Sequence, residues 1–148
     1  MSRDVNGAYI FSGSGALIFS QENMDETVSE VDLEYLSNFI STIETIAVEI
    51  QEEDVKEIEF GNIKFFHTRD KLSKIQFLIK SDKDAKPKKI QQVLSNLMNI
   101  FLEKFTGIFT SPLVVKKEKM DAFIESISEI LGTGKKVEYF LDKIELVK

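Results

Sequence analysis

The sequence predicts an α+β domain in which an antiparallel sheet is covered by helices on both faces. Three observations indicate this class. Two short apolar runs flank a glycine-rich turn near the N-terminus, residues 55–80 alternate like a β-meander, and three segments repeat apolar residues at helical spacing. The resulting element order is β-β-α-β-β-β-α-α, followed by a C-terminal stretch.

The opening hairpin is predicted from residues 8–11 and 16–19, which flank Ser12-Gly13-Ser14-Gly15. Glycine permits positive φ, so this tetrapeptide is typical of a turn. Both runs are apolar at nearly every position, which favours strands covered on both faces. We expect polar residues 1–7 to be loose and residues 20–31 to form a loop.

A helix is predicted over residues 33–50, with Asp32 as its N-cap. Its main apolar stripe consists of Leu33, Leu36, Ile40, Ile43, Ala47 and Ile50. Phe39 and Ile46 form a second stripe, and we expect them, with Glu49, to form a protein interface. An equally weighted alternative is that helix tilt or the 20–31 loop buries these apolar side chains.

The meander is predicted as residues 55–60, a Gly61-Asn62 turn, residues 63–67, a polar turn at 68–71, and residues 72–80. Two further helices follow, over 87–106 with Pro87 as first residue and over 118–131 before Gly132. The apolar residues Val137, Phe140, Leu141 and Ile144 stand at helical spacing, although a strand is the alternative there.

The hairpin 9–19, the 33–50 helix and the meander 58–65 together resemble the longin-like domain of the longin/roadblock superfamily. The resemblance covers about residues 8–131 of a single domain spanning 1–148, with 132–148 as a C-terminal extension. It implies a five-stranded antiparallel sheet with one helix on one face and the other helices on the opposite face. Domains of this kind commonly dimerise and serve as platforms for small Ras-like GTPases or in membrane-traffic complexes.

No catalytic, cofactor or metal site is predicted. The chain has no cysteine, and its single histidine, His67, has no histidine or cysteine partner. Gly13-Ser14-Gly15 precedes a strand and not a helix, which favours a hairpin turn over a phosphate loop or a nucleophile. The carboxylates are interpreted as a solvated acidic face; they are Glu49, Glu52, Glu53, Asp54, Glu57 and Glu59.

The charge and hydropathy of the chain limit the kinds of partner that it is expected to bind. The net charge of −6 and a pI of about 4.9 disfavour nucleic-acid binding. Two lysine clusters, at 83–89 and 116–119, are interpreted as solvated loops, with acidic headgroups or an acidic partner as the alternative. Because neither a signal peptide nor a membrane span is seen in the sequence, we expect a cytoplasmic protein with at most peripheral membrane contact.

The sequence therefore favours a non-catalytic protein-interaction module that forms homo- or heterodimers. The alternative is a small-molecule-sensing domain of the PAS or GAF type, which would need a buried cavity with convergent polar groups. An enzyme ranks last, because it would need perturbed carboxylates clustered around His67.

Overall fold

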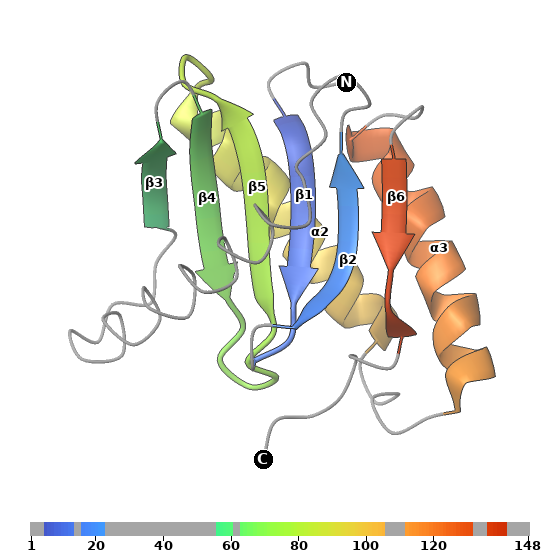
Figure 1. The fold of residues 1–148 in the computed structure, drawn as a ribbon. Helices are drawn as coiled ribbons and strands as arrows, with labels where there is room; N and C mark the ends of the chain where they lie inside the picture. Colours follow the sequence, from blue (N-terminus) through green and yellow to red (C-terminus); the bar gives the residue numbers. More distant parts are fainter. Residues whose placement is uncertain are drawn as a thin grey trace.

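The computed structural model describes residues 5–13, 16–22, 56–60, 63–105, 112–131 and 136–141. Its described strands form one antiparallel sheet in the order β3-β4-β5-β1-β2-β6 (Figure 1). The strands are β1 (Val5–Phe11), β2 (Leu17–Glu22), β3 (Lys56–Phe60), β4 (Ile63–Arg69), β5 (Gln76–Asp82) and β6 (Lys136–Tyr139). The two described helices are α2 (Pro87–Phe105) and α3 (Leu113–Leu131).

The predicted opening hairpin is present, but its strands are longer than the apolar runs. In the turn, the Ser12 amide donates to the Ala16 carbonyl at 2.8 Å, and the Ala16 amide donates to Ser12 Oγ at 3.0 Å. Residues 5–7 and 20–22 were expected to be loop and are strand instead. The reason is pairing: β1 lies between β5 and β2, so ladder hydrogen bonds hold these polar residues extended.

The predicted meander is also present, with its second turn shifted. β4 continues to Arg69, and β5 begins at Gln76 and not at Leu72. The Asp70 carboxylate accepts hydrogen bonds from the Ser73 amide at 2.8 Å and its hydroxyl at 2.7 Å, which closes a turn over residues 70–75. Lys74 adopts a positive φ of 67° in this turn. As a result Leu72 is 92% exposed at its tip.

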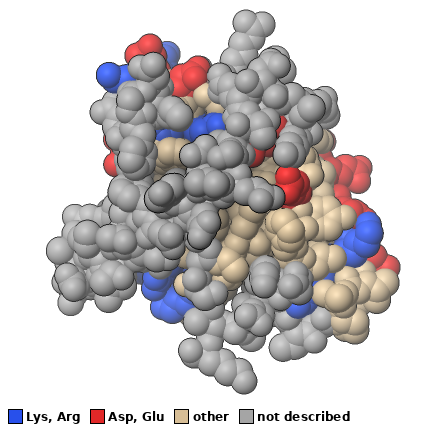
Figure 2. Space-filling model, in the orientation of Figure 1, with Lys and Arg blue, Asp and Glu red and all other residues tan. Residues whose placement is uncertain are grey.

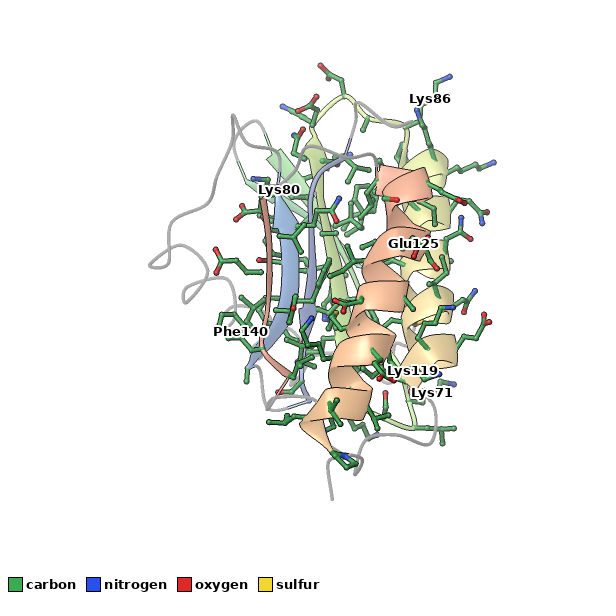
Figure 3. The ribbon with its side chains drawn as sticks, turned by 90° about the vertical axis from the view of Figure 1, so that its right-hand side faces the viewer. Lys71, Lys80, Lys86, Lys119, Glu125 and Phe140 are labelled. Atoms are coloured by element: carbon green, nitrogen blue, oxygen red, sulfur yellow. The ribbon has the colours of Figure 1, made fainter. Side chains whose placement is uncertain are left out.

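Both described helices pack on the same face of the sheet, as Figure 3 shows from the side. α2 begins at Pro87 as predicted. α3 begins at Leu113, five residues before the predicted start, because the Pro112 carbonyl accepts from the amides of Val115 and Lys116 at 3.1 Å each. The main core lies between this face and the two helices; its largest fully buried rings are Phe19, Phe66, Phe77, Phe101, Phe105 and Phe123.

The described residues form a sheet of six strands, one more than the five that the resemblance implied. β6 pairs with β2 through the register Phe19–Tyr139 to Glu22–Lys136, so part of the expected C-terminal extension belongs to the sheet. Val137 and Tyr139 pack against the main core, which is the period-two pattern of a strand. The helix predicted over 33–50, and with it the cover of the opposite face, lies outside the described residues and stays a prediction.

Candidate functional site

The interface residues predicted from the sequence, Phe39, Ile46 and Glu49, lie outside the described residues. Their helix is predicted to pack on the sheet face opposite α2 and α3, which we term the second face. The structure describes the strands of this face, and they carry two groups of buried side chains. One group is apolar and the other is polar.

The apolar group consists of Tyr9, Phe11, Phe65 and Leu78, with half-buried Leu17 packed against it. Each of the first four is at most 8% exposed. They come from three neighbouring strands, and alternation along each strand separates them from the main core on the other face. The centre of the second face is therefore formed by buried apolar side chains.

The polar group is centred on Gly7 in β1. Gly7 pairs with Lys80 of β5 on one side and with Glu22 of β2 on the other. Lys80 Nζ lies 3.8 Å from Glu22 Oε2, and both side chains are 4% exposed. An ion pair thus spans the central strand within the protein interior, where one partner alone would be costly.

Tyr9 completes this polar group, because its hydroxyl donates to Glu22 Oε2 at 2.9 Å. Burial, and then the negative charge and hydrogen bond of Glu22, hold the pKa of the Tyr9 hydroxyl far above its ordinary value. Tyr9 therefore remains a neutral donor. A Cβ on residue 7 would lie 2.7 Å from Tyr9 Oη, so only glycine leaves room for the hydroxyl above the central strand.

Sequence reasoning missed this polar group. Glu22 was predicted to lie in a loop. In β5 the apolar pattern indicated a buried face on the side of the strand opposite Lys80. A usable signal was present in the period of two, since Gln76, Leu78 and Lys80 share one face of β5. Because an unpaired charge is costly to bury, a lysine on the same strand face as buried residues predicts a partner that is buried beside it.

His67 lies on β4 and is 4% exposed. Its Nε2 is 3.2 Å from Gln76 Oε1, and Gln76 Nε2 donates to the Ser12 carbonyl at 3.0 Å. Since an amide oxygen accepts, Nε2 carries the proton in this contact. These contacts link β4, β5 and the end of β1, which supports a structural role for His67.

Of the acidic candidates, Glu57 is exposed, whereas Glu49, Glu52, Glu53 and Asp54 lie outside the described residues. Among the described residues, no three His, Asp or Glu side chains are placed to hold an ion. Lys86, Lys88 and Lys89 are exposed at the start of α2. In the second lysine cluster, Lys116 is buried, whereas Lys117 and Lys119 are exposed. Neither described helix is long and apolar enough to cross a membrane.

No protein-family model matches the chain, and no curated protein is similar to it in sequence. Solved structures do resemble it. MglB from Myxococcus xanthus aligns with a TM-score of 0.50 at 14% identity, over 67% of this chain and 85% of MglB. A roadblock/LC7 domain from Streptomyces avermitilis aligns with a TM-score of 0.46 at 9% identity, over 88% of each chain.

The chain therefore has a roadblock/longin-like fold, which confirms the resemblance inferred from the sequence. At this level of identity the likeness concerns the fold and not the partners.

Proposed function

We propose that this protein is a non-catalytic interaction module, a dimerising platform or regulator for small Ras-like GTPases or membrane-traffic complexes. The observation that carries the proposal is the roadblock/longin-like fold shared with MglB. The resemblance implies that domains of this fold work by pairing and by presenting a surface to other proteins.

The polar group on the second face supports this function over the small-molecule sensor. A sensor needs polar groups that converge on a ligand within a cavity. Buried polar side chains of the second face instead contact other protein groups: Tyr9 and Lys80 contact Glu22 across β1, and His67 contacts Gln76. This arrangement suits a scaffold more than a ligand site.

The proposed interface is the second apolar stripe of the predicted 33–50 helix, Phe39 and Ile46, together with Glu49. We term these three residues the outer stripe. A helix packed on a sheet needs only one apolar stripe, and these two apolar residues are left over. Full burial of each contributes roughly 1.5–3 kcal/mol before the entropy of association is subtracted. A two-fold axis would use the stripe twice, which is the commonest geometry for a homodimer.

Sedimentation velocity tests this interface directly. The wild type should sediment as a dimer at high concentration, and Phe39→Glu with Ile46→Lys should sediment as a monomer that still unfolds cooperatively. A matched control is Gln92→Glu with Asn99→Lys, which places the same charges seven residues apart on exposed positions of α2. The control should remain dimeric. A monomeric wild type would exclude the homodimer, and the heterodimer would fail if the double variant still captured every native partner.

A further inference from the structure

One end of the sheet collects turns and helix ends from separate parts of the chain. The β4–β5 turn, the end of β1 and the start of β2 lie there, because Arg69 pairs with Gln76, Gln76 with Phe11, and Phe11 with Leu17. The end of β6 and the start of α3 reach the same end, at the bottom of Figure 1. We term this the turn end.

The turn end holds the exposed apolar side chains of the described residues. Four large hydrophobic side chains are exposed in that part of the chain, namely Leu72 (92%), Leu113 (58%), Val114 (65%) and Phe140 (41%). Leu72 lies at the tip of the β4–β5 turn, Leu113 and Val114 open α3, and Phe140 follows β6. Single exposed apolar residues are ordinary, but their gathering at one end is a feature of interaction surfaces.

Cationic side chains lie on the β4–β5 turn and in the first turns of α3. Figure 3 places Lys71 and Lys119 in its lower half and Phe140 on the opposite side of the view, and Figure 2 shows uncharged surface where α3 begins, with both cationic and acidic atoms above it. Lys117 is paired with Asp121 at 3.1 Å, and the Asp70 carboxylate is bonded to Ser73. Apart from the Lys117–Asp121 pair, the described residues of the turn end include more cations than carboxylates. The cations are Arg69, Lys71, Lys74, Lys104 and Lys119, and the carboxylates are Asp70, Glu103 and Glu118. The described residues of the turn end thus carry a net positive charge, although the whole chain has a net charge of −6.

We propose that the turn end docks onto an anionic lipid bilayer, with its apolar tips in the interfacial layer and its lysines against the headgroups. The tips project from separate elements, and the ends of β1 and β2 lie between the β4–β5 turn and α3 in Figure 1. A stable protein partner of standard size buries a continuous complementary surface of about 800 Å² per side. A fluid bilayer accepts separate apolar tips, and anionic headgroups attract the cations beside them.

Vesicle sedimentation with the full chain tests this proposal. The wild type should sediment with phosphatidylcholine vesicles that contain phosphatidylserine, bind pure phosphatidylcholine far more weakly, and lose binding as salt rises. Leu72→Glu with Val114→Glu should weaken binding by at least about tenfold, because charged tips no longer enter the interface. Lys71→Glu with Lys119→Glu should weaken it by about fivefold or more for each lysine.

The matched control is Lys86→Glu with Lys88→Glu, an equal charge change on exposed lysines at the opposite end of α2. It should bind vesicles like the wild type, and circular dichroism should show all variants folded. A wild type that leaves anionic vesicles unbound would overturn the proposal, even if it still binds an acidic protein. So would a control that loses as much binding as the turn-end lysine variant. The residues differ from those of the proposed dimer interface, so either proposal can fail alone.

Discussion

The two faces of the sheet bury different kinds of side chain. Beneath α2 and α3 the contacts are aromatic: the Phe101 ring meets Phe77 and Phe123 edge to face, at centroid distances of 5.8 and 5.2 Å, and stacks on Phe105 at 4.5 Å. On the second face, buried rings lie beside an ion pair and a tyrosine hydroxyl.

The two faces therefore contribute differently to the free energy of folding and to the choice of strand register. Apolar packing is roughly proportional to the area removed from water and has little direction. The contact of Lys80, Glu22 and Tyr9 around Gly7 is directional, and slipping a strand by one residue would move its side chains to the other face. We infer that the face beneath α2 and α3 supplies most of the free energy of folding, whereas the polar group fixes the register of β5, β1 and β2.

Phe101→Ala should produce the largest effect. It removes a ring that is fully buried among three others, so the free energy of unfolding should fall by about 3–5 kcal/mol. Urea denaturation followed by circular dichroism measures the change. A loss below about 1 kcal/mol would contradict the inference that this face supplies most of the stability.

Lys80→Met should come next, at about 3 kcal/mol, because the Glu22 carboxylate would stay buried without its cation. Adding Glu22→Gln should restore most of the loss, since the amide oxygen still accepts from Tyr9 and no charge remains. A double-mutant cycle in urea measures this coupling. Strictly additive losses would show that the two side chains do not act as a pair.

Tyr9→Phe should cost about 1.5 kcal/mol at neutral pH by removing the hydrogen bond to Glu22. The pKa of Tyr9 is raised in the folded state, so the unfolded chain releases the proton first above about pH 10. Wild-type stability should therefore fall by about 1.4 kcal/mol per pH unit there, relative to the variant. Parallel wild-type and variant curves between pH 9 and about 11 would contradict this account of the hydroxyl.

His67→Gln should have the smallest effect, below about 1 kcal/mol, because a glutamine amide can still donate to Gln76. Partner binding should be unchanged. His67→Leu serves as the comparison, since it leaves the Gln76 oxygen without this donor and should cost more. Loss of biological activity in His67→Gln, with stability and partner binding intact, would revive an enzymatic role.

Local pattern was sufficient to predict the hairpin, the meander and α2. These segments have a clear period, and Pro87 and the glycine-rich turn mark their boundaries. Strand pairing, which a local sequence pattern does not show, determined the remaining elements. Glu22 became strand through its neighbours in the sheet, and residues 136–139 joined β2 although the apolar spacing favoured a helix.

The polar group around Gly7 could not be predicted for a similar reason. Glu22 and Lys80 are distant in sequence, and only the order β5-β1-β2 brings them to either side of one glycine. Tyr9 gave no sign of its role, because its own strand is apolar at neighbouring positions. Topology, and not local preference, creates this contact.

The central claim is that the protein functions by binding other proteins through the outer stripe of the 33–50 helix. Affinity capture from native lysate, with the wild type, the Phe39→Glu/Ile46→Lys variant and the Gln92→Glu/Asn99→Lys control, tests it most directly. The wild type and the control should both retain a small Ras-like GTPase or a second roadblock/longin-like protein, and the Phe39→Glu/Ile46→Lys variant should retain neither. Identical captured proteins in all three samples would contradict the claim.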